Sequence, residues 1–406
     1  MVDADIIVVG AGPVGMLAAL LAAQEGLSVL LLEQSARQSF QSRAIGITPP
    51  SLEILDRLGL AGVFIAQGVA VRASEVYGRG RRLGRVDFSG LPGDFPFVLA
   101  LPQDKSTAIL EEALLTHASI RFLRDHRVTD CREEESRVRV SGSRSDAASF
   151  SYAGQYVLAC DGGKSAVRES LGIPFKGAQE RCTFLMGDYR DTTGWGAKAL
   201  FFCTERGSVE SFPLPEGKRR YVLRTPRFIK EYSSDFLADE LLSRAGVDLA
   251  GVRQFWESGF GVQRFTAARF CQGRVFLCGD AAHLMSPVGG QNMNSGFADA
   301  ELAVWLTRIL LEKRAALFPV NRLYDRVRRR AVGTSLRRAR WIMLAGTSGG
   351  LAWSAFRNLV ALFFLHTPLR YYLARWFSMH SIPYRNLKHA RVSLEKELNL
   401  PDGRPL

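Results

Sequence analysis

Apolar runs of strand length alternate with helix-forming stretches in the first part of the chain. Residues 5–9 (DIIVV) and 28–32 (SVLLL) have the character of buried parallel strands, and residues 16–24 between them are rich in helix formers. Two later runs, 156–161 (YVLACD) and 274–283 (RVFLCGDAAH), repeat the strand pattern. The pattern predicts an α/β fold with a Rossmann-like parallel sheet.

The turn between the first strand and the first helix has the spacing of a dinucleotide-binding loop. Its sequence, GAGPVG at 10–15, is a G-x-G-x-x-G motif that follows a strand and opens a helix. We expect Gly10 to permit the tight turn, Gly12 to let a pyrophosphate approach the backbone, and Gly15 to let the helix lie close to the sheet. The helix N-terminus would offer N–H groups and a positive dipole to the phosphates. The alternative is a turn whose glycines serve packing alone.

The acid at the end of the second strand narrows the choice of ligand. Glu33 lies 23 residues after Gly10, and a carboxylate there can accept both hydrogen bonds of an adenosine ribose. It also disfavours a 2′-phosphate, so we expect the pocket to hold FAD or NAD rather than NADP. The residues predicted to bind the dinucleotide here are Gly10, Gly12, Pro13, Val14, Gly15 and Glu33.

Two later strands also end near a carboxylate, Asp161 and Asp280. Ligands of open α/β sheets bind at the carboxyl ends of the strands, and Asp280 is suited to accept hydrogen bonds from a polyol such as a ribityl chain. The Gly-rich run 287–296 opens another helix, so its N–H groups can face an electron-rich ring edge such as N1–C2=O of a flavin. For either aspartate alone, a helix N-cap or a turn acceptor is the alternative.

Four segments, in this order, resemble the motifs of the group A flavoprotein monooxygenases, the family of p-hydroxybenzoate hydroxylase and the ubiquinone-biosynthesis hydroxylases. They are the turn at 10–15, the arginine segment around Arg43, the DG motif at Asp161–Arg168 and the GD motif at Gly279–Pro287. The resemblance implies a fold like that of p-hydroxybenzoate hydroxylase and glutathione reductase. It also implies FAD as the cofactor and NAD(P)H as a transient co-substrate.

The resemblance further implies how particular residues meet the cofactor. Val128 would meet the adenine side through its backbone, and Asp280 would bind the ribityl chain. Met293 and Asn294 would offer backbone N–H groups to the flavin ring, with the Pro287 carbonyl near the substrate. The DG motif of the family is associated with both FAD and NAD(P)H. The residues implied to contact the cofactor are Arg43, Gln103, Val128, Asp161, Asp280, Pro287, Gly289, Gly290, Asn292, Met293 and Asn294.

One residue departs from the family pattern. Asn292 gives GGQNMN where the relatives commonly have GGQGMN. If this position requires a positive φ, asparagine tolerates it better than most residues. The departure therefore bears on the geometry of the loop and little on FAD itself.

The middle of the chain predicts a second unit. Strand-like runs separated by a helix at about 234–245 lie between the DG and GD motifs, at 198–203, 209–212 and 220–224. We expect a mixed β-sheet domain, inserted into the FAD-binding domain, to carry the substrate pocket. The predicted boundaries are 1–180 and 260–340 for the discontinuous FAD-binding domain, 181–259 for the substrate-binding domain and 341–406 for a basic helical C-terminal region.

Candidate substrate-pocket residues lie in this middle unit. Arg220 and Tyr221 fall near the position where relatives use an arginine to govern flavin movement, and an exposed edge-strand pair is the alternative. Four aromatic residues could line the pocket, although core packing is the commoner role for each. They are Trp195, Phe201, Phe202 and Phe212.

The net charge of +13 is concentrated near the C-terminus. Residues 326–394 contain thirteen Lys and Arg and no acid, mixed with apolar runs that are shorter than the ~20 residues a membrane span needs. Basic amphipathic helices at an anionic membrane surface are one interpretation, and a helical cap with solvated arginines is the other. No nucleic-acid-binding module is recognisable. The six scattered cysteines and the first ten residues, which lack a cationic signal-peptide segment, predict a cytoplasmic protein, either free or peripheral to the inner face of the membrane.

These patterns together predict an FAD-dependent monooxygenase that hydroxylates an aromatic or quinol-like substrate with NAD(P)H and O₂ through a flavin C4a-hydroperoxide. No metal is expected, and no pattern identifies a catalytic base. A flavin-dependent reductase of an isoprenoid-like substrate and a non-catalytic FAD-binding component of a biosynthetic complex are the alternatives. A flavin-dependent halogenase would carry a Trp-x-Trp-x-Ile-Pro signature, which GWGA at 194–197 does not match.

Overall fold

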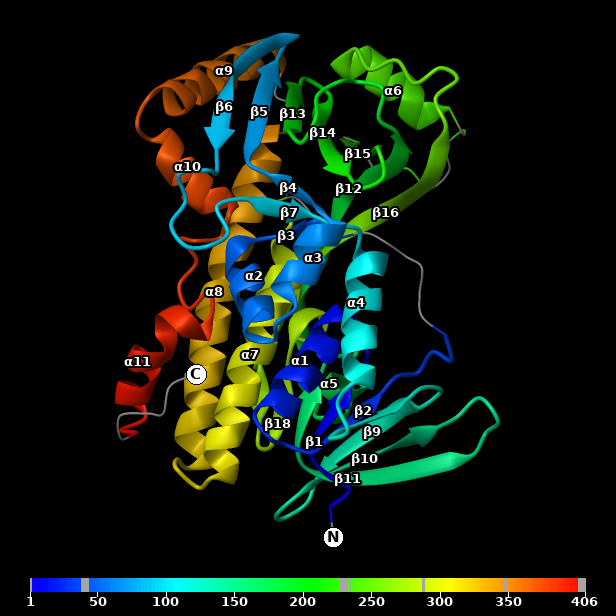
Figure 1. The fold of residues 1–406 in the computed structure, drawn as a ribbon, viewed down its shortest axis with the longest axis vertical. Helices are drawn as coiled ribbons and strands as arrows, with labels where there is room; N and C mark the ends of the chain where they lie inside the picture. The colour runs from blue at the N-terminus through cyan, green and yellow to red at the C-terminus, as the bar shows by residue number, and fades with distance from the viewer. Residues whose placement is uncertain are drawn as a thin grey trace.

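The computed structural model describes residues 2–37, 44–225, 229, 233, 235–286, 289–346 and 350–400. The described part contains two large sheets, one toward each end of the molecule, and a small three-stranded sheet between them (Figure 1). The long helix α8 (Leu317–Gly346) runs along the long axis from one end toward the other. The sequence prediction of an α/β fold with a second mixed sheet and C-terminal helices is confirmed.

The first sheet is built around the apolar runs that the sequence analysis singled out. Strand β1 pairs in parallel with β2 and β11, and β18 pairs in parallel with β11. Strands β1, β2 and β18 are buried on both faces, which explains why they read as unbroken apolar runs. The strand order is β17-β18-β11-β1-β2-β8, with β10 and β9 continuing antiparallel from β11. The bounds are β1 Ala4–Val9, β2 Val29–Leu32, β8 Ile120–Leu123, β9 Arg127–Glu133, β10 Val138–Ser143, β11 Ser149–Ala159, β17 Cys271–Gln272 and β18 Val275–Leu277.

Helices cover the first sheet. Helix α1 (Pro13–Gln24) contacts both α4 (Gln103–Leu115) and α7 (Gln291–Leu311). Helix α7 is almost wholly buried, because it lies between the sheet and the C-terminal helices. The shorter elements of this part are α2 Pro49–Arg57, α3 Ala61–Gln67, α5 Ala166–Ser170, the 3₁₀ helix η1 Gly279–Ala281 and the three-stranded sheet of β3 Gly46–Ile47, β7 Val98–Ala100 and β4 Val69–Val71.

The second sheet is mixed. Its order is β19-β16-β12-β15-β14-β13-β5-β6, and all its pairs are antiparallel except β13 with β5. Strands β5 and β6 come from the first hundred residues, outside the range 181–259 that the sequence analysis assigned to this unit. The bounds are β5 Ala73–Gly78, β6 Arg81–Asp87, β12 Phe175–Arg190, β13 Ala199–Thr204, β14 Gly207–Leu214, β15 Lys218–Arg224, β16 Gln254–Ala267 and β19 His283–Leu284.

The two faces of the second sheet have different partners. Because side chains alternate along a strand, neighbours such as Tyr221 and Val222 point to opposite faces. One face carries Leu185, Tyr221 and Leu223 and packs against α6 (Phe236–Ala245). The other face carries Phe184, Met186 and Val222 and borders a large cavity. This second face is the part of the sheet that matters for function.

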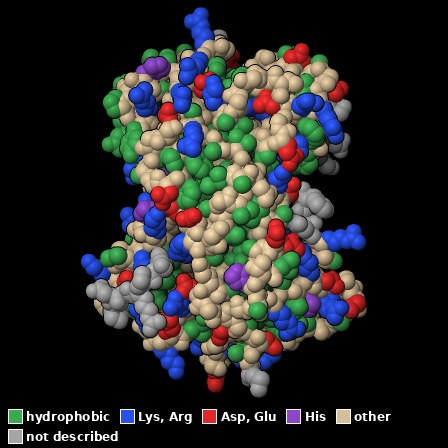
Figure 2. Space-filling model, viewed as in Figure 1, with side chains coloured by type: hydrophobic (Ala, Val, Ile, Leu, Met, Phe, Trp, Pro, Cys, Tyr) green, Lys and Arg blue, Asp and Glu red, His purple; other side chains and the backbone are tan. Residues whose placement is uncertain are grey.

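The C-terminal helices pack on both units. Helices α9 (Gly350–His366) and α10 (Arg370–Phe377) lie against β6, where Leu83 and Val86 share a core with Leu365 and Ala374. Helix α11 (Leu387–Glu397) contacts α7. None of the helices in the described part of the chain combines the length and the apolar character that crossing a membrane requires. Hydrophobic side chains remain on the surface over α9 and α10, at the upper left of Figure 2.

Three arginines of the basic tail lie inside the protein. The side chain of Arg328 donates to Asp299 over 2.6 Å, that of Arg338 to the Ser381 carbonyl over 3.0 Å, and that of Arg357 to the Cys203 carbonyl over 2.9 Å. The expectation that the arginines of a helical cap would be solvated is wrong for these residues. Arg328 and Arg357 hold α8 and α9 to earlier parts of the chain through buried hydrogen bonds, and Arg338 ties α8 to the segment after α10.

Candidate active site

The glycines of the first turn differ in what surrounds them. Gly10 has a φ of +98°, and a Cβ added there would collide with the Cys160 carbonyl of the neighbouring strand. A Cβ added at Gly15 would collide with the Gly10 carbonyl. A Cβ added at Gly12 would meet nothing within 4 Å, and Gly12 lines the cavity. The first two glycines are therefore required by packing, whereas Gly12 borders open space that a phosphate group fits.

Glu33 and Gln103 stand at the same part of the cavity. The Glu33 carboxylate accepts hydrogen bonds from the backbone N–H groups of Ala11 and Ser35, both over 2.8 Å. The Gln103 side-chain oxygen accepts one from the backbone N–H of Ala44 over 3.2 Å. These contacts fix the two side chains at the cavity wall, where the Glu33 carboxylate keeps lone pairs that can accept from ribose hydroxyl groups.

The DG motif ties the first sheet to the GD motif. One oxygen of Asp161 accepts from the backbone N–H of Val167 over 3.1 Å, and the other is buried without a partner in the described residues. Burial raises the pKa of this carboxyl. The buried Arg168 donates to the carbonyls of Gly163 and Ala281, over 2.9 and 3.0 Å. Arg168 thus ties the DG motif to the backbone directly after Asp280.

The GD motif leads into helix α7. Gly289 and Gly290 have positive φ values of 79° and 61°, and the helix begins at Gln291. Asn292 lies in the first turn of α7 and is not among the described residues with positive φ, so this position does not require the glycine that relatives have. Its side-chain amide donates to Asp280 over 2.7 Å. Asn292 therefore orients the carboxylate predicted to bind the ribityl chain.

A buried chain of hydrogen bonds, which the sequence analysis did not foresee, supports this loop. The side chain of Asn292 also meets His283 over 3.2 Å, and His283 meets Asp299 over 2.7 Å. Burial would raise the pKa of Asp299, but the nearby Arg328 and His283 hold it below its usual value. The C-terminal helix α8, through Arg328, is in this way linked to the predicted cofactor loop. The signal in the sequence was weak, because these residues are distant along the chain.

A single cavity of about 1490 Å³ connects the predicted cofactor residues to the second sheet. Pockets that hold one drug-sized ligand are typically ~300–1,000 Å³, so this volume accommodates a cofactor and a substrate together. Gly10, Gly15, Val128, Asp161 and Asn294 are not among its lining residues, and Arg43 and Pro287 lie outside the described residues. The predicted residues that line it are Gly12, Pro13, Val14, Glu33, Gln103, Asp280, Gly289, Gly290, Asn292 and Met293.

Asn294 does not line the cavity, but its side chain holds the loop in place through hydrogen bonds. Its side chain donates to the Gly46 carbonyl over 2.9 Å and accepts from the backbone N–H of Thr48 over 2.9 Å. Asn294 is buried, and these bonds fix the first turn of α7 to strand β3. The contact of its backbone N–H group with the flavin ring stays a prediction.

The cavity-facing side of the second sheet is mainly apolar and aromatic. Phe201 and Phe212 line the cavity, whereas Trp195 and Phe202 belong to the core under α6. Two of the four aromatic residues proposed from the sequence are thus placed at the pocket, and two have the packing role that was the alternative.

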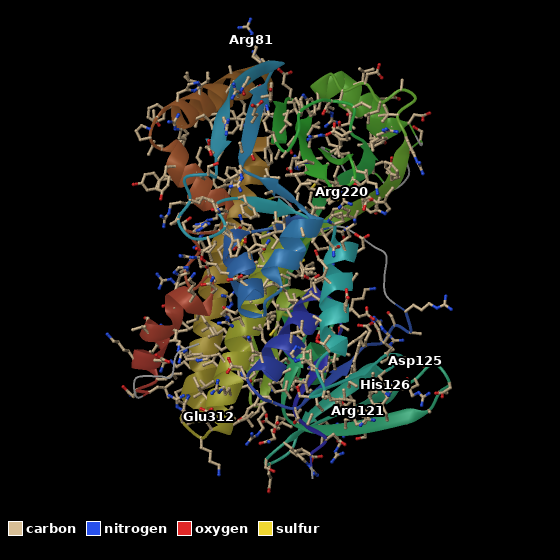
Figure 3. The ribbon with its side chains drawn as sticks, in the orientation of Figure 1. Arg81, Arg121, Asp125, His126, Arg220 and Glu312 are labelled. Atoms are coloured by element: carbon tan, nitrogen blue, oxygen red, sulfur yellow. The ribbon has the colours of Figure 1, made fainter. Side chains whose placement is uncertain are left out.

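Arg220 occupies the junction between the two large sheets (Figure 3). It is fully buried and forms a two-point ion pair with Asp188, over 2.6 and 2.7 Å. Its guanidinium also lies 4.7 Å from the centre of the Trp256 ring. The alternative of an exposed edge-strand pair is therefore wrong, since both Arg220 and Tyr221 are buried. Arg220 faces the cavity, and Tyr221 faces α6.

Two contributions to the cavity were not predicted from the sequence. Glu210 of β14 lines it as an acid among apolar side chains, and the only signal was its place in the alternating run 209–212. Helices α9 and α10 supply aromatic side chains to the wall, and no local pattern placed them there. These are Trp353, Phe356, Phe364, Trp376 and Phe377.

Comparison with known proteins agrees with this geometry. Residues 3–326 match the family model described as an FAD binding domain. The chain belongs to this family. The resemblance inferred from the four motifs is confirmed, and the set of lining residues fits FAD.

Named relatives and solved structures extend the comparison. The chain is 31% identical, over 74% of its length, to a rifampicin monooxygenase of Streptomyces venezuelae, and it spans 63% of the length of that protein. The fold resembles a p-nitrophenol 4-monooxygenase of Pseudomonas putida, with a TM-score of 0.84 at 22% identity over 94% of this chain and 98% of that one. It also resembles an anhydrotetracycline hydroxylase of Streptomyces rimosus, with a TM-score of 0.78 at 27% identity over 93% of this chain and 76% of that one.

Proposed function

We propose that this protein is an FAD-dependent monooxygenase that uses NAD(P)H and dioxygen to hydroxylate an apolar aromatic substrate. The observation that carries the proposal is the single cavity that runs from the dinucleotide-binding turn to the apolar face of the second sheet. A cofactor at one end and an organic ring at the other would share one continuous cavity. The relatives named as monooxygenases of rifampicin, tetracyclines and nitrophenol support the same reaction class.

We further propose a division of labour within the chain. The FAD-binding part corresponds to 1–180 and 260–340, and the substrate-binding part to 181–259 together with β5 and β6. The basic helical region at 341–406 would close the cavity through α9 and α10. The residues proposed to hold FAD are Gly10, Gly12, Pro13, Val14, Gly15, Glu33, Gln103, Val128, Asp161, Asp280, Gly289, Gly290, Asn292, Met293 and Asn294.

The residues of the chain would bind, orient and shield the reactants. When bound, FAD supplies the capacity to accept hydride from NAD(P)H and to activate dioxygen. The backbone of the turn at Gly12 would hold the pyrophosphate, and Asp280, oriented by Asn292, would hold the ribityl chain. The aromatic wall formed by residues such as Phe201 and Phe212 would position the ring and exclude water.

The proposal is tested by NAD(P)H oxidation. Purified, FAD-loaded protein is assayed in air without substrate and then with a panel of phenols and lipophilic quinols. We expect a slow basal rate that one compound raises many-fold, with a product heavier by one oxygen atom. A rate that no compound changes, while FAD stays bound, would favour a reductase or a non-catalytic FAD-binding component.

A further inference from the structure

One carboxyl group in the substrate part of the cavity is unlike its neighbours. Glu210 lies on β14, opposite Phe201 of β13 and Val222 of β15. Residues opposite each other in a sheet share a face, and all three line the cavity. Glu210 therefore projects from an apolar wall into the space proposed for the substrate.

The Glu210 carboxyl is buried and has no protein partner in the described residues. The exposed fraction of Glu210 is 5%, and its carboxyl group makes no hydrogen bond or ion pair with any residue that the structure describes. Burial alone raises its pKa to about 7. An unpaired buried acid costs stability, so its presence points to a ligand that completes its hydrogen bonding.

Two charged groups nearby, Arg220 and Arg357, are engaged elsewhere. Arg220 is bound on two points by Asp188, and Arg357 of α9 donates to the carbonyls of Cys203 and Thr204. Burial raises the pKa of the Cys203 thiol, which therefore stays protonated at neutral pH. The ionisable side chains around Glu210 on the adjoining strands and on α9 are Cys203, Asp188, Arg220, Arg224 and Arg357.

We propose that Glu210 accepts the hydroxyl proton of a phenolic substrate and thereby selects rings that carry a free hydroxyl group. This inference rests on the hydroxylase function proposed above. The phenol O–H bond breaks, the proton moves to a Glu210 oxygen, and the electron pair stays on the phenolic oxygen. No electrons are transferred in this step. The ring becomes more electron-rich and hence more reactive toward electrophilic oxygen, and the carboxyl group returns the proton to the product oxygen.

The Glu210 carboxyl group has the properties that proton transfer requires. A general base works best when its pKa lies near the operating pH, and positioned bases typically contribute about 10²–10⁴-fold to a rate. The surrounding phenylalanine and methionine side chains exclude water, which strengthens a hydrogen bond between carboxylate and phenol. Asp188 is the other acid near this face of the sheet, and it is held by Arg220. Among the described residues of the second sheet, no other acid lines the cavity and could replace Glu210.

The test compares two probes that differ by one methyl group. 4-Nitrophenol carries a hydroxyl proton and changes colour on ionisation, whereas 4-nitroanisole has no such proton. Both are titrated into oxidised, FAD-loaded protein, and binding is followed by the flavin spectrum and by the nitrophenol absorbance. The variants are Glu210→Gln and, as the matched control, Glu205→Gln, an exposed glutamate in the turn between β13 and β14. FAD content confirms that each variant is folded.

We expect the wild type to prefer 4-nitrophenol to 4-nitroanisole, and Glu210→Gln to weaken nitrophenol binding by about tenfold or more while leaving nitroanisole unchanged. Equal binding of the two probes by the wild type, or equal weakening of both by the variant, would overturn the inference. Because no turnover is measured, a protein that shows the preference yet hydroxylates nothing would contradict only the proposed function.

Discussion

At the scale of single residues, two buried ionisable groups of the second sheet differ in whether the protein supplies a partner for them. Arg220 has an acid bound on two points and an aromatic ring beside it, so its charge is satisfied within the protein. Glu210 lies on the same face of the sheet with no such partner. A paired group of this kind contributes to structure, whereas an unpaired one carries a stability cost that a bound substrate would offset.

Replacement of Glu210 by glutamine should stabilise the protein at high pH. Burial raises the carboxyl pKa from 4.5 to about 7, so the folded state keeps this proton after the unfolded state has lost it. The wild type therefore loses stability as pH rises from about 4.5 to about 7. At about 1.4 kcal/mol per pKa unit, the advantage of Glu210→Gln should grow to no more than about 3.5 kcal/mol above neutral pH.

Urea unfolding of the FAD-loaded proteins at pH 5 and pH 8 measures this difference. Glu205→Gln, an exposed glutamate paired with Arg79, should show no comparable growth between the two conditions. A variant whose advantage is the same at both pH values would show that Glu210 is not held neutral by burial.

At the scale of elements, the sequence predicted what depends on local pattern. The run at 5–9 became β1 (Ala4–Val9), and the run at 220–224 lies within β15, because apolar periodicity and the Gly-rich turn act over short distances. The pairing of β13 with β5, residues Ala199 and Ser74, depends on long-range packing that local pattern does not encode. The position of α9 at the cavity also depends on long-range packing, so no local pattern predicted that its aromatic residues line the wall.

Two glycines of the first turn allow its role in folding and its role in FAD binding to be tested separately. Gly12 has an ordinary φ of −72° and open space beside its Cα, so Gly12→Ala should fold normally and bind FAD more weakly, because its methyl group occupies the position of the pyrophosphate. Gly10 has φ +98° and a carbonyl in the way, so Gly10→Ala should destabilise the fold by about 1–3 kcal/mol or more.

Thermal unfolding of the FAD-free proteins and FAD titration by fluorescence separate the two effects. The expected pattern is a lowered Tm for Gly10→Ala alone and a raised FAD Kd for Gly12→Ala at unchanged Tm. Tight FAD binding by a well-folded Gly12→Ala protein would show that the pyrophosphate lies elsewhere.

At the scale of the whole molecule, function is assigned to a space that distant parts of the chain enclose. The turn at 10–15, the face of the second sheet and helices α9 and α10 all border the same cavity. Burial of Arg328, Arg338 and Arg357 fastens the C-terminal helices in place, so the basic tail is partly internal structure. Motifs in the sequence identified the cofactor end of this space, and only the fold revealed the substrate end.

The most direct test of the central claim is the origin of the oxygen atom in the product. FAD-loaded protein, NAD(P)H and the phenol that most stimulates NAD(P)H oxidation are incubated under oxygen-18 gas, and in parallel in oxygen-18 water under ordinary air. A hydroxylase that acts in this cavity should give a product with one heavy oxygen atom from the gas and none from the water. A product labelled from water, or NAD(P)H consumption without any oxygenated product, would contradict the account.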